Sequence, residues 1–177
     1  MTNYVYIATS LDGFIATGDG GLDWLNEIPN SEKSDFGYAE FMRGIDAIVM
    51  GRKTFEKILA FDAWPYDIPV YVLSKSKIST PDELDDKVEI ITGNPKKVVD
   101  QLNELGHQNL YIDGGITIQG FLEEDLIDKM IITRVPVLLG EGIPLFGKLT
   151  QRLYFKHEKT EFLNEILSKS YYTRIRE

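Results

Sequence analysis

The 177-residue sequence contains no cysteine and only two histidines, His107 and His157. Without thiols the chain can form no disulfide, no thiolate metal site and no Cys nucleophile. The two histidines lie far apart in the sequence, and neither has a partner at the spacing of metal ligands. We therefore expect no metal centre.

Long apolar runs are missing as well. No stretch approaches the roughly 18 consecutive apolar residues that suggest a membrane span. The Met1-Thr2-Asn3 start lacks a basic segment followed by an apolar one. We therefore expect no signal peptide, no contact with a membrane and a cytoplasmic location.

Basic residues are outnumbered, with 19 Lys and Arg against 28 Asp and Glu, which gives a net charge of −9. A field of this sign repels polyanions, so nucleic acid is not an expected partner and any phosphate site must be local. Two common phosphate motifs are absent. Asp46 stands where a P-loop needs its first glycine, and the pattern G-x-G-x-x-G occurs nowhere.

What is present is the composition of a globular domain, 43% hydrophobic and 27% charged. A chain of this kind can bury a substantial core, and its length is that of one ordinary domain. No repeat, linker or low-complexity segment divides it. We expect a single domain over residues 1–177.

One stretch combines a buried strand with groups that suit an anion. Residues 47–50 form a short apolar run of the kind that is buried on both faces of a parallel sheet. Gly51 ends the run, and Arg52, Lys53 and Thr54 follow where a helix begins. A cation, a hydroxyl and free backbone N–H groups then meet at one helix N-terminus, where anions bind. An ordinary strand-to-helix connection with surface charges explains the same residues.

Two further strand ends have similar chemistry. The apolar run 70–73 ends at Leu73 and is followed by Ser74 and Lys75, which supply a hydroxyl and an ammonium group. The run 109–113 leads into two adjacent glycines and then into a helix start. Paired glycines let the backbone approach a ligand closely, although turn geometry alone would also require them. These residues are Gly114, Gly115, Ile116 and Thr117.

The rest of the pattern alternates strands and helices. Strands are predicted at 4–9, 88–92, 127–139, 153–163 and 167–175, and helices at 34–43, 54–59, 94–105 and from 116 onward. Asn164 and Glu165 are predicted to turn the last hairpin. Repeated strand-helix units followed by a hairpin predict an α/β fold: a three-layer α/β/α sandwich around a mixed, mostly parallel sheet, with a C-terminal antiparallel hairpin.

The order of the three strand ends resembles the dihydrofolate reductase superfold. Two segments narrow the resemblance: Ser10-Leu-Asp-Gly-Phe-Ile15 and Pro136-Val-Leu-Leu-Gly-Glu-Gly-Ile-Pro-Leu-Phe146. They are similar to the branch that contains the reductase domain of the bifunctional riboflavin-biosynthesis deaminase/reductase and its stand-alone relatives. The resemblance covers nearly the whole chain and implies a dihydrofolate-reductase-like domain.

The resemblance also implies NADPH as the cofactor. A guanidinium group matches phosphate geometry, so Arg52 would pair with the 2′-phosphate, with Ser74 and Lys75 beside it. The pyrophosphate would lie at the two helix starts, and the nicotinamide against Ala8 and Ile15. The full set of implied cofactor residues is Ala8, Ile15, Gly51, Arg52, Lys53, Thr54, Leu73, Ser74, Lys75, Gly114, Gly115, Ile116 and Thr117.

The substrate side is less defined. The resemblance implies a pocket with Asp12, Trp24 and Thr133. Dihydrofolate reductases use one helix carboxylate to support protonation of the substrate ring, and Asp35, seventeen residues before Arg52, has a compatible place. Asp35 would also serve as a helix cap, and Glu27 and Glu40 are alternatives.

The implied activity is transfer of hydride from NADPH to a small heterocyclic or carbonyl substrate, such as a ribosylamino-pyrimidine phosphate of riboflavin biosynthesis. Two alternatives stay open, a true dihydrofolate reductase and an NADPH-binding regulatory protein without turnover. The segment 55–70 contains Lys57 as its one basic residue, so a partner for the glutamate carboxylate of folate is missing. The resemblance and the long C-terminal strands also predict a homodimer.

Overall fold

A computed structural model describes residues 1–30, 33–76 and 78–176 of the chain. Its main sheet contains the strands β1 (Thr2–Thr9), β3 (Ala47–Gly51), β4 (Val70–Leu73), β5 (Val88–Ile91), β6 (Asn109–Asp113), β7 (Lys129–Arg134), β9 (Tyr154–Leu163) and β10 (Leu167–Ile175). The helices are α1 (Asp23–Asn26), α2 (Tyr38–Met42), α3 (Arg52–Ile58), α4 (Pro95–Glu104) and α5 (Gly115–Glu123), with a short 3-10 helix at Asp82–Leu84.

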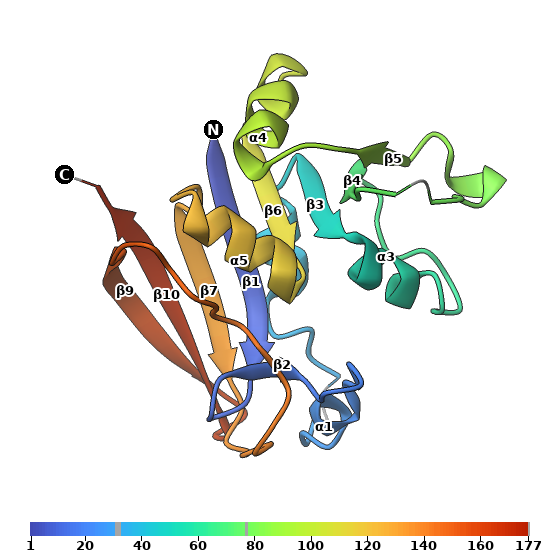
Figure 1. Cartoon of the computed structure of the whole chain (residues 1–177). Coiled ribbons are helices and arrows are strands. Elements are labelled where there is room, and N and C mark those ends of the chain that lie inside the picture. Colours follow the sequence, from blue (N-terminus) through green and yellow to red (C-terminus); the bar gives the residue numbers. More distant parts are fainter. Residues whose placement is uncertain (31–32, 77, 177) are drawn as a thin grey trace.

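The order of strands across this sheet is β5-β4-β3-β6-β1-β7-β10-β9 (Figure 1). The strands from β5 to β7 run parallel to their neighbours, whereas β10 is antiparallel to β7 and β9 is antiparallel to β10. A second, two-stranded sheet pairs β2 (Phe14–Ala16) with β8 (Ile143–Pro144). The observed architecture therefore confirms the predicted mixed, mostly parallel sheet with a C-terminal antiparallel hairpin.

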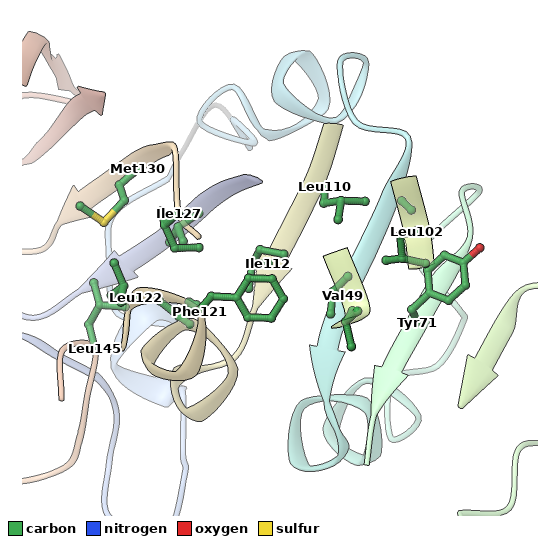
Figure 2. Packing of buried hydrophobic residues seen from close by; sticks show 14 of the residues in the cluster. Val49, Tyr71, Leu102, Leu110, Ile112, Phe121, Leu122, Ile127, Met130 and Leu145 are labelled. Carbon is green, nitrogen blue, oxygen red and sulfur yellow. The ribbon is translucent and has the colours of Figure 1, made fainter. Parts of the chain in front are cut away.

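Helices cover both faces of the sheet because successive residues of the central parallel strands β3 and β6 are apolar and buried. Val49 and Ile112 belong to the buried cluster that contains residues of α4 and α5, and Figure 2 shows Phe121 of α5 directed at Ile112. Ile48 and Met50 belong to the opposite cluster, with Phe55 of α3. The result is three layers, with the sheet in the middle.

Several elements begin or end as their local sequence predicts. Strands β4, β6 and β10 match the predicted ranges 70–73, 109–113 and 167–175. Asn94 caps α4 by accepting a hydrogen bond from the Lys97 N–H at 2.9 Å, with Pro95 as the first helical residue. Asn164 and Glu165 both have positive φ, 50° and 58°, as a tight hairpin turn of the I′ kind requires.

Two predictions of extent were wrong. The strand expected at 127–139 is β7, which ends at Arg134, because Pro136 has no N–H for a sheet ladder and Val137 N–H turns back to the Val135 carbonyl at 2.8 Å. The helix expected at 34–43 is reduced to α2. Phe36 and Gly37 have positive φ, 54° and 84°, and a helix cannot pass through such residues.

No helix within the described residues has the length and apolar character needed to cross a membrane. The same residues bring together no cluster of three His, Asp or Glu side chains that could hold a metal ion.

Candidate functional site

The carboxyl ends of the parallel strands meet at one edge of the sheet. Strands β3 and β6 are neighbours there, with Met50 opposite Asp113. Strand β3 leads into α3 on one face, and β6 leads into α5 on the other face. Ligands of open α/β sheets bind in the crevice that such a change of direction creates.

The starts of α3 and α5 interlock through two glycines and two threonines. A Cβ added to Gly51 would lie 2.7 Å from the Thr117 hydroxyl oxygen, and one added to Gly114 would fall on the Thr54 hydroxyl oxygen. Each helix start therefore needs glycine where the other helix presents its threonine. The two predicted segments, far apart in sequence, form one surface.

A third segment reaches the same place. Ile15 of β2 occupies the space beside Gly115, since a Cβ on that glycine would lie 2.7 Å from Ile15 Cδ1. Ile116, the next residue of α5, is 73% exposed. With Ile116 at the rim and Ile15 inside, this surface has apolar side chains against which a flat ring can pack.

Neither α3 nor α5 has a side-chain cap at its start among the described residues. The first backbone N–H groups of a helix then remain available as donors and lie at the positive end of the helix dipole. Two such ends side by side suit the two phosphates of a dinucleotide.

Arg52 connects the start of α3 with the end of β4. Its guanidinium donates to the Ser76 hydroxyl at 3.2 Å and lies 3.4 Å from a carboxylate oxygen of Glu56. Ser74 is buried and forms the turn by donating to the Ser76 carbonyl at 2.8 Å. The guanidinium is therefore held at the edge of the crevice, where Lys53 and Lys75 are also exposed.

A glycine-rich loop lies over α3. Lys57 of α3 donates from Nζ to the Gly20 carbonyl, and the loop is closed by a Thr17 N–H to Gly21 carbonyl hydrogen bond of 3.1 Å. Lys57, the one basic residue of the segment 55–70, therefore already has a hydrogen-bond acceptor within the protein.

A second region of the site lies where β1 and β7 end. Ala8 stands opposite Thr133 of β7, and Thr133 stands opposite Lys169 of β10. Lys169 is only 4% exposed, and its Nζ donates to the Phe36 carbonyl at 2.7 Å. Burial lowers the pKa of Lys169, and the nearby Glu161 carboxylate opposes that shift. A buried ammonium therefore borders the predicted substrate pocket.

Asp113 lies at the end of β6, opposite Met50 and immediately before Gly114, at the edge of the sheet where the crevice lies. Its Oδ1 accepts the Gly114 N–H at 2.8 Å. Burial raises the pKa of Asp113, while the hydrogen bond from the Gly114 N–H opposes the shift. Burial, followed by the Asp113 charge, raises the pKa of Tyr38 to about 12 and also raises that of Tyr66. A carboxyl that resists ionisation thus lies among tyrosines.

Asp35 has a different environment. It is exposed, and its two oxygens accept the Ala39 N–H at 2.8 Å and the Gly37 N–H at 2.9 Å. These hydrogen bonds lower the pKa of Asp35. The alternatives Glu27 and Glu40 are exposed too. The geometry gives Asp35 the capping role at the start of α2.

Asp12 and Trp24 hold loops beside the crevice. Asp12 accepts hydrogen bonds from the Ser10 hydroxyl at 2.6 Å and from the Leu139 and Gly140 N–H groups at 3.2 and 2.8 Å. Trp24 is buried against Val135, and its Nε1–H has no hydrogen-bond partner in the described part of the chain.

Sequence reasoning missed Asp113 and Lys169, although each had a signal. Asp113 is the polar end of an apolar strand immediately before two glycines. Lys169 alternates with Leu167 and Tyr171, so the period of a strand places it on the inward face with them.

Comparison with known proteins defines the class first. The fold is that of the dihydrofolate reductases. The structure of dihydrofolate reductase from Enterococcus faecalis, complexed with NADP(H), is similar with a TM-score of 0.68 at 16% identity. The match covers 98% of this chain and 96% of that chain. A deaminase/5-amino-6-(5-phosphoribosylamino)uracil reductase from Thermotoga maritima has a TM-score of 0.77 at 16% identity, covering 98% of this chain and 56% of that chain.

The family follows from the sequence match. Residues 4–166 match the RibD C-terminal domain, so the chain belongs to that reductase-like family. A candidate riboflavin biosynthesis protein from Shewanella sp. PV-4 is 48% identical, with a TM-score of 0.95 and coverage of 99% of this chain and 100% of that chain. The predicted resemblance is thereby confirmed.

Proposed function

We propose that the protein is an NADPH-dependent reductase of a small heterocyclic or carbonyl substrate of the ribosylamino-pyrimidine phosphate type. The observation that carries the proposal is the interlock of two uncapped helix starts, with Thr54 over Gly114 and Thr117 over Gly51. Membership of the RibD C-terminal domain family supports it.

The crevice fits NADPH in its chemistry. The pyrophosphate would accept from the N–H groups at the starts of α3 and α5, and the 2′-phosphate would pair with Arg52. The nicotinamide would lie against Ala8 and Ile15. When bound, the cofactor supplies the hydride, and the protein holds the substrate beside it away from water.

The protein itself would orient the substrate and supply a proton to it. Because burial raises its pKa, Asp113 keeps a proton to higher pH than an exposed carboxyl does. When hydride adds to one atom of a double bond in a heterocycle or an imine, the neighbouring atom must take up a proton. We propose Asp113 for this proton transfer, the role for which the sequence had pointed to Asp35.

A direct test follows the absorbance of NADPH in the presence of three probes: a ribosylamino-pyrimidine phosphate, dihydrofolate and simple carbonyl compounds. We expect oxidation with the first probe and none with dihydrofolate, because Lys57, the one basic residue of the segment 55–70, already binds the Gly20 carbonyl. Tight NADPH binding without turnover of any probe would support the regulatory alternative instead.

A matched pair of variants tests the proton transfer. Asp113→Asn should lower kcat by about 100-fold or more, the usual scale of general acid catalysis, with NADPH affinity retained. Its raised pKa predicts that wild-type kcat falls as pH rises through that pKa, since the protonated form is the active one. Asp35→Asn should leave kcat and this pH profile unchanged. The opposite result, with Asp35→Asn inactive and Asp113→Asn active, would exchange the two roles.

A further inference from the structure

Strand β10 contains a buried lysine that the proposed reaction does not use. Lys169 is 4% exposed and belongs to the strand between β7 and β9 (Figure 1). Its Nζ donates to the Phe36 carbonyl at 2.7 Å and lies over two tyrosine rings, 5.1 Å from the centroid of Tyr6 and 5.5 Å from that of Tyr171. A carbonyl and two aromatic rings attract an ammonium group, but they do not neutralise its charge.

Two carboxylates act on this ammonium from a distance, and both are bound to other donors. Glu161 stands opposite Lys169 on β9, yet its oxygens accept from the Lys159 ammonium and, at 2.8 Å, from the Tyr171 hydroxyl. The oxygens of the exposed Asp35 accept backbone N–H groups at the start of α2. Among the described residues, no carboxylate forms an ion pair with Lys169. An unpaired charge at a buried position is costly, and such groups are concentrated at functional sites.

The register of the sheet places this lysine beside the predicted substrate pocket. Lys169 stands opposite Thr133 of β7, and Thr133 stands opposite Ala8 of β1, the predicted contact of the nicotinamide. Since neighbouring strands lie about 4.8 Å apart, the backbone of Lys169 is roughly 10 Å from that of Ala8. This separation suits a substrate whose reacting carbon lies over β1 and whose charged group points toward β10.

The charge of the whole protein makes a local cation necessary for an anionic substrate. A net charge of −9 repels a phosphate group, so a positive charge inside the pocket must overcome that field. A buried ammonium acts on such a group more strongly than an exposed one, because water and salt screen it less. The exposed Lys159 is already paired with Glu161, whereas the buried Lys169 has its charge available.

We propose that the Lys169 ammonium makes the substrate pocket selective for an anionic substrate, and that its counter-ion is the phosphate monoester of a sugar phosphate. The inference rests on the proposed reductase function, because it takes the substrate to lie beside Ala8 and Thr133. A substrate without the phosphate leaves the buried ammonium unpaired and therefore binds more weakly. Lys169 is then the residue that distinguishes the phosphorylated substrate from its neutral analogue.

Calorimetric titration with ribose 5-phosphate and with ribose tests this selectivity. We expect the wild type to bind the phosphorylated sugar more tightly. Lys169→Met keeps the apolar stem and removes the charge. It should weaken the binding of ribose 5-phosphate by roughly tenfold to a hundredfold, the scale of losing a hydrogen bond to a charged group. Ribose should bind the variant and the wild type equally. The variant should fold, because the Phe36 carbonyl still accepts from the Tyr6 hydroxyl at 2.9 Å.

A second variant should have an effect of the opposite sign. Glu161→Gln removes the carboxylate that stands opposite Lys169 and leaves the ammonium in place. It should tighten the binding of ribose 5-phosphate by about two- to fivefold, the scale of a partly exposed charge pair. In the double variant Lys169→Met/Glu161→Gln this gain should disappear. Lys97→Met makes the same change of charge at an exposed position of α4 and should not alter either affinity.

The titrations are done without cofactor and with NADP+, so their result requires no hydride transfer. Phosphate selectivity that depends on Lys169, in a protein that oxidises no NADPH with any probe, would support the phosphate site and reject the reductase activity. NADPH oxidation by a protein that binds ribose 5-phosphate no better than ribose would do the reverse. A Lys169→Met variant that binds both sugars like the wild type would overturn the proposal. Equal losses for both sugars would also overturn it, since they indicate a lysine that only maintains the fold.

Discussion

Helices α4 and α5 begin in opposite ways. At the start of α4, Pro95 has no N–H, Lys96 N–H donates to the Glu124 carboxylate at 3.1 Å, and Lys97 N–H donates to Asn94 at 2.9 Å. The start of α5 has Gly114 at φ 89° and, within the described residues, no side-chain cap.

The difference predicts different roles for the two helix starts. A helix start satisfied by the protein's own acceptors needs no ligand, as at α4. The starts of α3 and α5 face each other across two glycines, and neither has a side-chain cap within the described residues. We expect changes at α5 to affect cofactor binding, and changes at α4 to affect stability alone.

The largest expected effect is that of Gly114→Ala. The new Cβ would fall on the Thr54 hydroxyl oxygen, and φ 89° is unfavourable for alanine. Strain and overpacking together should cost roughly 2 to 5 kcal/mol in the free energy of unfolding. Because Thr54 must move, the rise in melting temperature on adding NADPH should be lost as well.

Gly106→Ala is the matched control. Gly106 follows α4 with φ 93°, and a Cβ there would meet nothing within 4 Å. Backbone strain alone should cost about 1 to 2 kcal/mol, with the NADPH-induced shift in melting temperature intact. Equal losses of that shift in both variants would show that Gly114 acts through stability rather than through the crevice.

A smaller effect is expected from Arg52→Ala. If the guanidinium pairs with the 2′-phosphate, its loss should narrow the difference in affinity between NADPH and NADH by roughly 1.5 to 3 kcal/mol, the scale of a hydrogen bond to a charged group. Calorimetric titration of both cofactors measures this difference. Arg43→Ala removes the same charge from the exposed end of α2 and should leave the difference unchanged. Equal affinities of the wild type for NADPH and NADH would remove the 2′-phosphate assignment.

The segments predicted to bind the cofactor could be located from the sequence because their signals are local. Each segment is contiguous, so Gly51 to Thr54 and Gly114 to Thr117 carry strand end, glycine and helix start within a few residues. The cap at Asn94 was local in the same sense. The fold class followed from the order of these units.

The substrate side depends on contacts between distant strands. Ala8, Thr133 and Lys169 become neighbours only through the register of β1, β7 and β10. The shortened start of α2 depends on Phe36, whose positive φ is rare for an aromatic residue and follows from no local pattern. The sequence therefore predicted Asp35 within a longer helix, whereas Asp35 lies before α2 and accepts the Gly37 and Ala39 N–H groups.

The smallest expected effect, from Asn94→Ala at the start of α4, completes the comparison. Losing the cap should lower the free energy of unfolding by about 1 kcal/mol, because the Lys97 N–H loses its acceptor. Urea denaturation measures the change. Asn103→Ala makes the same substitution at an exposed position inside α4 and should be neutral or slightly stabilising. NADPH affinity should be unchanged in both variants. Weaker NADPH binding in Asn94→Ala alone would mean that α4 also contributes to cofactor binding. The distinction between the capped start of α4 and the uncapped starts of α3 and α5 would then not hold.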